Sequence, residues 1–293
     1  MMQSEPLNAT AIADFDHLMI ATFDHDLAIK AYSELGFKVR PVRQLAPMGG
    51  GSAGGDGGSA AVLLRARTAG CANYLELAKA DRITAMPMMQ DILCQAEGPA
   101  MLVHATLDPD RLAMEWTALG VDMQRVRLSL PPFGEGPPVD LEVFLVPKGQ
   151  APFAFNACWY SSPYDFEREE WRDHPNGALH WTGFSFPVDD NSFNVSVKRF
   201  IDLYGASPSV TEGDVAAFRL GETTLTVWKR SAFQRKYGTG ADGGLVHIAV
   251  RSITHLATYF AERRIEFTEL DSIIKIGGHY ANGTNLLFEQ VKD

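Results

Sequence analysis

Two histidines and two glutamates in this sequence have the residue types and the setting needed to bind a metal ion or to move protons. His17 and His247 each lie in an apolar segment with the composition of a β-strand, one near each end of the chain. Because side chains alternate along a strand, both imidazoles should point away from the apolar face that packs beneath a helix. Glu76 and Glu289 each interrupt an otherwise apolar strand-like segment. A carboxylate buried there must be paired or bound to a cation.

These side chains offer a set of donors that several divalent metals accept. Two imidazoles with one or two carboxylates suit Fe, Zn, Ni, Mn or Co. Two histidines and one carboxylate with open positions form the site of non-haem iron oxygenases. Two histidines and two glutamates instead suit Lewis-acid activation of an oxygenated substrate. We therefore expect a divalent metal ion as cofactor, and the residues alone leave both chemistries open.

The segments that must position these residues belong to a pattern that occurs four times along the chain. Each copy starts with an apolar strand, continues through a polar turn into an amphipathic helix, and is followed by short strand-like segments. The first strands cover residues 15–22, 100–107, 179–186 and 245–250, and the polar turns contain Asp24, Asp108, Asp189 and Thr254, the last as a helix cap. The pattern predicts an α+β fold of four βαβββ modules, which pair so that their sheets enclose a concave surface for a ligand.

The second and third copies lack candidate ligands at the positions that correspond to the histidine and the glutamate. Counting back from the helix cap, the second copy has Met101 in the histidine position and Asn156 in the glutamate position. The third copy has Thr182 or Gly183 in the histidine position. His104 lies outside that position and is expected to be a structural histidine. The candidate ligands therefore come from the first and fourth copies.

The repeats divide the chain into two halves joined by a connector. Modules one and two occupy residues 14–160, and modules three and four occupy residues 178–293. The polar and aromatic segment 161–177 between them is expected to be a linker or crossover. Seven of the ten residues from Gly49 to Gly58 are glycine. That composition predicts a solvated loop and not regular structure.

Several short motifs occur in order along the chain. They are Phe15-Asp-His-Leu-Met-Ile-Ala21, Glu34-Leu-Gly-Phe37, Asn73-Tyr-Leu-Glu-Leu77 and Gly283-Thr-Asn-Leu-Leu-Phe-Glu289. These motifs resemble the vicinal oxygen chelate superfamily, which includes glyoxalase I, bleomycin-resistance proteins and extradiol dioxygenases. The segments 151–156 and 168–178 are similar to a bacterial glyoxalase-like subgroup. The resemblance covers residues 14–291 and implies two glyoxalase-like domains with cup-shaped mixed β-sheets.

The resemblance implies a ligand set that depends on how the modules pair. The superfamily's ligand positions, on the first and last strands of a module, map to His17, Glu76, His247 and Glu289. This set requires modules one and four to form one cup and modules two and three another, which is the pairing we expect. If the modules pair in sequence order, the implied ligands are His180, His247 and Glu289, with His180 in place of His17.

Further residues are candidates for substrate binding or proton transfer at this cup. The position of His279 and Tyr280, shortly before Glu289, is similar to that of the acid–base tyrosine of extradiol enzymes. Either side chain is therefore a candidate to move a proton. Glu76 is a candidate for the same role. Arg251 is expected on the concave face, where it would bind a substrate carboxylate or neutralise Glu289.

The resemblance implies three functions. The leading one is a metal-dependent, glyoxalase-type lyase or isomerase that binds vicinal oxygens of a small substrate and stabilises an enediolate, while Glu76 or Glu289 shuttles a proton. The second is an Fe(II) extradiol ring-cleavage dioxygenase. The third is a metal-free protein that binds a small molecule, as resistance proteins of this fold do. One fold hosts all three, so fold alone does not decide between them.

Composition limits the partners of the chain. The 293 residues carry 26 Lys and Arg against 36 Asp and Glu, a net charge of −10, and no basic run. This charge disfavours nucleic acid, and the absence of an apolar stretch of about 18 residues disfavours a membrane span. The three cysteines show no metal-binding or redox spacing, which fits a reducing cytoplasm. The expected partner is a small-molecule substrate, and a homodimer is an assembly that the sequence permits.

Overall fold

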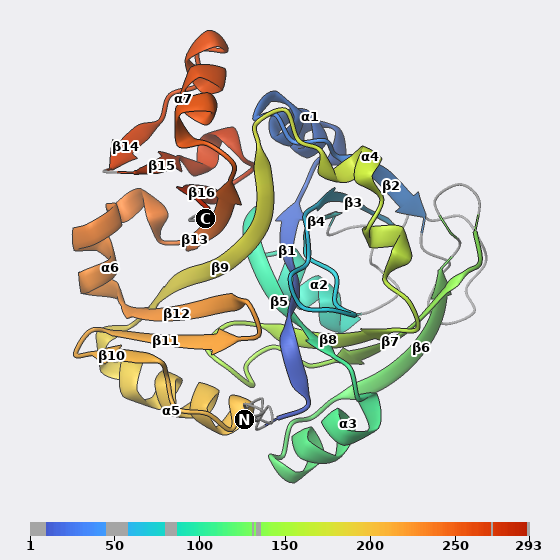
Figure 1. Cartoon of the computed structure of the whole chain (residues 1–293). Coiled ribbons are helices and arrows are strands. Elements are labelled where there is room, and N and C mark those ends of the chain that lie inside the picture. Colours follow the sequence, from blue (N-terminus) through green and yellow to red (C-terminus); the bar gives the residue numbers. More distant parts are fainter. Residues whose placement is uncertain are drawn as a thin grey trace, which may run out of the picture.

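Two curled, eight-stranded β-sheets form the framework of the protein (Figure 1). The computed structural model describes residues 10–44, 58–79, 87–130, 132, 136–270 and 272–291. The glycine-rich loop predicted from residue 49 onward lies outside the described residues, except that Gly58 begins a strand. No helix among the described residues has the length and apolar character needed to cross a membrane.

The strands of each sheet come from one half of the chain. Sheet A contains β1 (Ile12–Thr22), β2 (Arg40–Gln44), β3 (Gly58–Leu63), β4 (Tyr74–Lys79), β5 (Gly98–Thr106), β6 (Gln124–Leu130), β7 (Val139–Leu145) and β8 (Phe155–Tyr160). Sheet B contains β9 (Ala178–Val188), β10 (Val210–Glu212), β11 (Val215–Leu220), β12 (Thr223–Lys229), β13 (Leu245–Val250), β14 (Thr268–Leu270), β15 (Ile273–Ile276) and β16 (Asn285–Gln290). The strand orders are β2-β3-β4-β1-β5-β8-β7-β6 and β10-β11-β12-β9-β13-β16-β15-β14. Both sheets are mixed, as predicted.

Helices connect strands within each module and also lie between modules. The α-helices are α1 (His25–Glu34), α2 (Pro87–Leu93), α3 (Pro109–Ala118), α4 (Glu169–Arg172), α5 (Phe193–Tyr204), α6 (Arg230–Tyr237) and α7 (Ile253–Glu262). Short 3₁₀ helices are η2 (Tyr164–Phe166), η3 (Asp190–Ser192), η4 (Thr239–Ala241) and η5 (Gly278–Tyr280). The α+β fold of four βαβββ modules in two cup-shaped sheets is confirmed.

The modules pair in sequence order, so the predicted pairing of module one with module four is wrong. In sheet A, the central strands β1 and β5 join modules one and two through an antiparallel ladder that includes His17 opposite Val103. In sheet B, β9 and β13 join modules three and four in the same way, with Gly183 opposite His247. The long first strand of each module therefore finds its partner in the next module along the chain.

Side-chain caps start the helices close to the predicted positions. The Asp24 carboxylate accepts hydrogen bonds from two backbone N–H groups at the start of α1, and that of Asp108 accepts one at the start of α3. The cap of α7 is Ser252 and not Thr254, because the Ser252 hydroxyl accepts the backbone N–H of His255 at 3.2 Å. Helix α7 of module four is therefore capped two residues earlier in the sequence than predicted.

The two sheets pack against each other through their convex sides, with α1 and α7 near one end of the contact and α3 and α5 near the other (Figure 1). Aromatic residues of both halves share one core, in which the ring of Phe15 lies 6.1 Å from Trp181 and 6.3 Å from Tyr204. The concave sides therefore face away from this core and are left for ligands. The two halves therefore share one hydrophobic core.

His104 is a structural histidine at this contact, as predicted. Its Nδ1 donates to the carbonyl of Asn156 at 2.8 Å, and its Nε2 accepts from the hydroxyl of Tyr204, in sheet B's half, at 3.1 Å. The side chain is fully buried. Burial outweighs the Asn156 bond and lowers the pKa of His104 to about 4, so the ring is neutral at physiological pH.

We expect acid to weaken the contact between the halves through His104. Its pKa in the folded protein, about 4, lies below the ordinary value of 6.5, so its contribution is present above pH 6.5 and is lost as the pH falls toward 4. The loss should be on the order of 2–3 kcal/mol of unfolding free energy. Urea unfolding at pH 7 and pH 4.5 checks this: the advantage of the natural protein over His104→Gln should shrink at the lower pH. An advantage of His104 that is unchanged at pH 4.5 would contradict the prediction.

Candidate active site

The concave side of sheet A encloses a cavity of about 120 Å³. Its polar lining residues are His17, Arg40, Ser59, Tyr74, Glu76, Asn156, Cys158 and Tyr160. Its apolar lining residues are Met19, Met89, Met101, Val103, Leu128, Leu130, Leu141, Val143, Leu145 and Phe166. A mostly apolar hollow with a cluster of polar groups at one side is the usual form of a small-molecule site. We name this hollow cup one.

His17 lies between two carboxylates at the polar side of cup one. Its Nδ1 is 2.7 Å from Oδ1 of Asp16, and its Nε2 is 3.0 Å from Oε2 of Glu76. The ladder between β1 and β5 shifts register between Phe15 and His17. This irregularity explains how two consecutive residues, Asp16 and His17, reach the same face of a strand whose side chains otherwise alternate.

The two carboxylates determine the protonation of His17. Burial disfavours the imidazolium, but the hydrogen bonds and charges of Asp16 and Glu76 outweigh burial and raise the pKa of His17 to about 9. For Glu76, burial alone would raise the pKa, but the neighbouring His17, Ser59 and Arg40 lower it below its ordinary value. At neutral pH the pair is therefore an imidazolium next to an ionised carboxylate.

Arg40 brings a second cation to the same end of cup one. Its side chain is buried, with 3% of its surface exposed, and its guanidinium carbon lies 5.2 Å from the ring centre of Phe166. Burial lowers its pKa, but a guanidinium still keeps its proton in a protein. Two cations, His17 and Arg40, thus stand beside two carboxylates, Asp16 and Glu76. Their formal charges sum to zero without any further ion.

Three stacked rings and a second tyrosine support this charge cluster. The ring of Tyr74 stacks on His17 at 4.3 Å on one side and on Phe166 at 5.0 Å on the other. Tyr160 donates to Oδ1 of Asp16 at 3.0 Å, and its hydroxyl is 3.3 Å from that of Tyr74. Phe166 belongs to the segment predicted to be only a linker, so this connector also forms a wall of the site.

The strand registers show which positions of module two correspond to His17 and Glu76. His17 pairs with Tyr74 on β4, two residues before Glu76. In module two, Val103 pairs with Asn156 on β8, two residues before Cys158. The counterparts of the histidine and the glutamate are therefore Val103 and Cys158, each two residues beyond the predicted Met101 and Asn156.

The corresponding hollow of sheet B, cup two, contains the second histidine–glutamate pair. His247 pairs with Leu287, two residues before Glu289 on β16, so the pair repeats the spacing found in module one. The module-three counterparts are Gly183 and Thr226. His247 Nδ1 lies 3.6 Å from Glu289 Oε1, and its Nε2 is 2.8 Å from the Ser185 hydroxyl.

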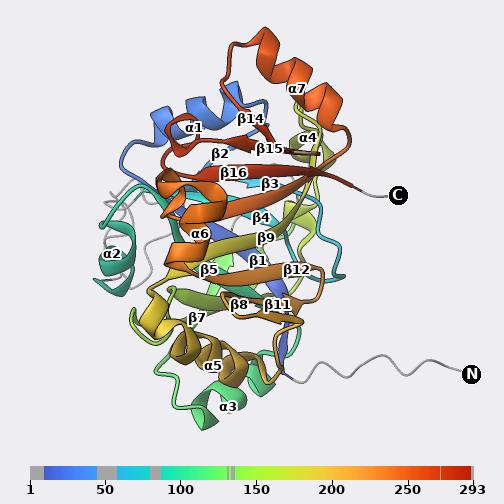
Figure 2. The same ribbon diagram turned by 90° about the vertical axis from the view of Figure 1, so that its left-hand side faces the viewer.

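Cup two is more polar and more open than cup one. Its lining residues are Arg67, Thr182, Gly183, Arg219, Glu222, Thr224, Thr226, His247 and Glu289. Helix α6 packs beside it on the same side of sheet B, the side seen in Figure 2, where Phe233 contacts Leu245 and Leu287. The two predicted histidine ligands thus stand in different sheets, and their predicted convergence on one ion is wrong. Each cup holds one histidine and one glutamate of the expected set of four.

The alternative ligand His180 does not join His247 either. Its Nδ1 donates to the backbone carbonyl of Arg65 at 2.6 Å, which fixes the ring at the contact between the two halves. It lies opposite Ala249 on β13 and borders a small hollow with Asp14 and Cys71. The ladder is irregular between His247 and its neighbour Ile248, so the alternation that predicted one shared face is broken there.

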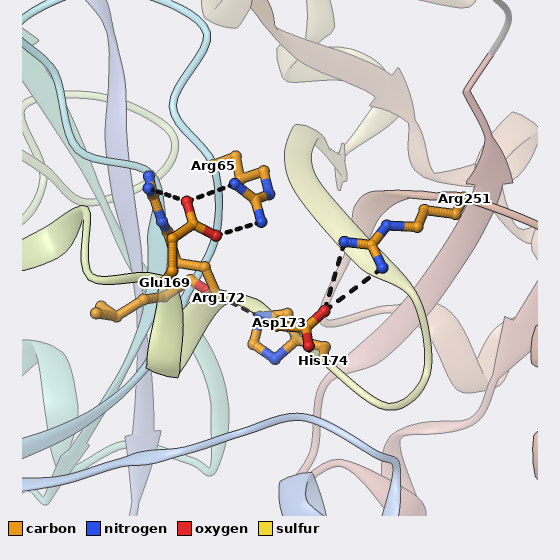
Figure 3. A network of polar contacts seen from close by, with 7 residues as sticks. Arg65, Glu169, Arg172, Asp173, His174 and Arg251 are labelled. Carbon is orange, nitrogen blue, oxygen red and sulfur yellow. Dashed lines mark hydrogen bonds and ion pairs between the residues drawn. The ribbon is translucent and has the colours of Figure 1, made fainter.

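Arg251 contacts the connector and is not among the residues that line cup two. Its guanidinium lies 3.4 Å from Oδ1 of Asp173, while Arg65 holds Glu169 of the same connector through two bonds of 2.6 and 2.7 Å (Figure 3). Strand β13 ends at Val250, so Arg251 lies beyond the alternating part of the strand. Its predicted role at Glu289 is therefore wrong.

His279 and Tyr280 belong to η5, away from both histidine–glutamate pairs. His279 lines a surface hollow together with Glu266 and Lys275, and none of the residues lining cup two borders it. The Tyr280 hydroxyl accepts the backbone N–H of Glu266 at 3.1 Å, and its ring packs on the core. His279 and Tyr280 are close to Glu289 in sequence, but neither lines cup two.

The donors of cup one do not match the metal site expected for the superfamily. Among the described residues that line it there is one imidazole, and the position opposite His17 is Val103, which cannot bind a metal. Donor atoms of Asp16, His17 and Cys158 lie within 4.8 Å of one another. Both nitrogens of His17 already face carboxylates, and burial raises the pKa of the Cys158 thiol far above the range in which it ionises. A dication would have to displace the His17 proton from a cluster that is already neutral.

Comparison with known proteins agrees with this architecture. The family model described as a glyoxalase-like domain matches residues 15–196, which is more than half of the chain. The chain belongs to the glyoxalase-like domain family. It is thereby a member of the vicinal oxygen chelate superfamily, as the motifs predicted. No curated protein matches this family member in sequence.

Three solved structures share the fold of this glyoxalase-like protein. A hypothetical protein from Staphylococcus aureus has a TM-score of 0.65 at 8% sequence identity, and the superposition covers 95% of this chain and 99% of the Staphylococcus aureus chain. A fusion of a xylose isomerase-like TIM barrel with 4-hydroxyphenylpyruvate dioxygenase has a TM-score of 0.51 at 10% identity, covering 99% of this chain and 50% of its own. A mutant of 4-hydroxymandelate synthase from Streptomyces coelicolor has a TM-score of 0.51 at 10% identity, covering 95% and 92%. At these identities the likeness concerns the fold alone.

Proposed function

We propose that cup one is the active site of an enzyme that moves a proton on a carbon next to a carbonyl group, with two protein cations in the place of a metal. The observation that carries the proposal is the contact of His17 Nε2 with Glu76 Oε2 at 3.0 Å, at the polar side of a mostly apolar cavity. A buried acid and a buried base side by side are suited to paired proton transfer.

Each side chain would have a defined part in the reaction. Glu76, ionised because of its neighbours, would take the proton from the carbon next to the carbonyl. The electron pair of the broken C–H bond would pass to the carbonyl oxygen and form an enolate, which His17 and Arg40 would stabilise through their positive charges. In a compound with a hydroxyl group on that carbon, passage of the hydroxyl proton to the enolate oxygen and return of the abstracted proton to the former carbonyl carbon would complete an isomerisation. Glu76 becomes neutral as the substrate becomes an enolate, so the total charge of substrate and cluster does not change during the reaction.

Asp16 would position His17 and would not touch the substrate. It accepts the Nδ1–H of His17 and is itself held by the Tyr160 hydroxyl and the backbone N–H of Ala72. A fully buried carboxylate behind the ring fixes its orientation and stabilises its charged form. The imidazolium therefore keeps its charge and its Nε2–H toward Glu76 at the polar side of the cavity.

The metal-dependent functions find less support in cup one. A glyoxalase-type metal site and an extradiol iron site both need two imidazoles, and cup one offers His17 alone among the described residues. Should a metal bind, Asp16, His17 and Cys158 would be the residues to hold it, because their donor atoms lie within 4.8 Å of one another. Its chemistry would be the polarisation of the substrate oxygen, which the proposal assigns to His17 and Arg40. A purely binding function uses the same cavity without the proton transfer.

Exchange of carbon-bound hydrogen in D₂O, followed by proton NMR, tests the proposal. The chelator-treated protein should exchange the hydrogens next to the carbonyl in a panel of small hydroxyketones and oxo acids. The variant Glu76→Gln should lose about 100-fold of this rate, because it removes the base. The variant Glu289→Gln, which alters the equivalent glutamate of cup two, should keep the rate.

Three outcomes would contradict this proposal. Exchange that disappears on chelation and returns with added Co²⁺, Ni²⁺, Zn²⁺, Mn²⁺ or Fe²⁺ would establish the metal-dependent reaction in its place. Binding of the panel compounds without exchange would indicate a protein that only binds its ligand. Retention of the rate by Glu76→Gln would remove that residue from the mechanism.

A further inference from the structure

We infer that the substrate of cup one is an uncharged, aliphatic carbonyl compound, an inference that rests on the proposed function and names the substrate class for that site. Three observations carry it. They are the division of the cavity into a polar and an aliphatic side, the closed stack of aromatic rings, and the neutral sum of the buried charges.

The aliphatic lining of the cavity comes from three strands of module two, of which β6 and β7 are neighbours, while β8 lies between β7 and β5. Strands β5, β6 and β7 contribute only apolar side chains, Met101, Val103, Leu128, Leu130, Leu141, Val143 and Leu145. Met89 on α2 adds to the same wall. The polar groups stand on β1 to β4 and on β8. A ligand with its oxygen at His17 must therefore direct its remaining atoms toward an aliphatic wall.

The aromatic residues of the site do not offer a slot for a planar ring. Tyr74 is covered by His17 on one face and by Phe166 on the other, at 4.3 and 5.0 Å between ring centres. Both faces of this ring are thus already stacked. The wall opposite is built from leucine, valine and methionine, whose flexible or branched side chains adapt to an alkyl chain. These contacts favour an alkyl group over a phenyl or catechol ring.

The buried charges favour a neutral molecule. The two cations and two carboxylates of the cluster balance one another before any ligand binds. A ligand carboxylate would add a negative charge without a counter-ion in a site shielded from water, which is unfavourable. The net charge of −10 for the whole chain also disfavours an anion. A neutral ketone leaves the balance intact, including when its proton passes to Glu76.

Three probes of comparable size separate these features: 1-hydroxyoctan-2-one, which is neutral and aliphatic, 2-oxooctanoate, which is charged, and 2-hydroxyacetophenone, which is aromatic. Dissociation constants from calorimetry on the full chain, with chelator present, should be at least about tenfold lower for the first probe than for the other two. Preference for either of the other probes, or equal binding of all three, would overturn the inference.

A charge variant tests the electrostatic step separately. Glu76→Gln removes one carboxylate and leaves the cluster with a net positive charge, so it should shift the ratio of dissociation constants toward 2-oxooctanoate by at least about tenfold. Val195→Thr, at an exposed position on α5, should leave the ratio unchanged. An unshifted ratio in Glu76→Gln would overturn the charge argument.

Failure of the inference and failure of the proposed function give different results. If 1-hydroxyoctan-2-one binds best but exchanges no hydrogen, the substrate class stands and the proton transfer is wrong. If hydrogen exchange occurs and is fastest with 2-oxooctanoate or 2-hydroxyacetophenone, the proton transfer stands and the substrate class is wrong.

Discussion

His17→Gln is expected to lower the unfolding free energy by about 3–5 kcal/mol near neutral pH, because it leaves buried carboxylates without their cation. His17 has 8% of its side chain exposed, Asp16 0% and Glu76 13%. Glutamine keeps much of the volume and some hydrogen bonding, so the lost charge is the main change. The variant should fold but unfold at a lower urea concentration.

The destabilisation should depend on pH in a direction that the His17 pKa fixes. The folded-state pKa, about 9, lies above the ordinary value of 6.5. The stabilisation by His17 is therefore fully present below pH 6.5 and is lost as the pH rises through about 9. The difference in unfolding free energy between the natural protein and His17→Gln should accordingly be largest near pH 6 and decrease toward pH 10.

Urea titrations at five pH values between 6 and 10 measure this difference, and cup two supplies the control. His247 has the same strand spacing to Glu289, but that carboxylate is 46% exposed and lies 3.6 Å away in an open hollow. His247→Gln should therefore cost less than about 1 kcal/mol. A His17→Gln effect that stays constant up to pH 10 would mean that His17 is neutral in the folded protein.

The module pattern could be predicted from the sequence because it depends on local signals. Alternating apolar residues in the strands and acidic caps such as Asp24 and Asp108 repeat at similar spacing, and each acts within a few residues. Strand alternation also placed His17 correctly in a concave surface, next to Glu76. The pair was predictable because β1 and β4 belong to one module.

The pairing of modules could not be predicted in this way, because the ladder between β1 and β5 is a long-range contact without a local sequence signal. All four modules have similar strands, so their patterns suit either arrangement. The spacing from cap to histidine was misleading as well. Ser252 caps α7 five residues after His247, whereas Asp24 follows His17 by seven. Counting back seven residues from the cap of module two therefore led to Met101, two residues before the actual counterpart Val103.

Two residues of the charge cluster at cup one were not predicted, for physical reasons. Asp16 should face away from His17 by alternation, and only the irregular register near Phe15 turns it to the same side. Arg40 lies in a strand with few apolar residues, where an arginine is normally exposed. In the fold its guanidinium packs against Phe166, which comes from the connector more than a hundred residues later. The one signal in the sequence was Arg40 itself, a charged residue in the same module as the predicted ligands His17 and Glu76.

Gly283→Ala is expected to destabilise the protein by about 2–4 kcal/mol, because the backbones of the two halves touch at this residue. A Cβ atom at Gly283 would lie 2.6 Å from the carbonyl oxygen of Glu97, and one at Gly98 would lie 2.8 Å from the carbonyl oxygen of Gly283. Beside it, the side-chain amide of Asn282 donates to the carbonyl of Ala21 at 3.2 Å. Backbone atoms cannot move aside as a side chain does, so the halves would have to separate locally.

Gly120→Ala separates the clash from the backbone conformation. Gly120 has a φ of +68° and Gly283 one of +78°, so alanine is unfavourable at both, by about 1–2 kcal/mol. A Cβ at Gly120 would meet no atom within 4 Å. The excess cost of Gly283→Ala over Gly120→Ala in thermal or urea unfolding therefore measures the contact between the halves. Equal costs would mean that the halves do not meet there, and the shared core would then have to carry their association alone.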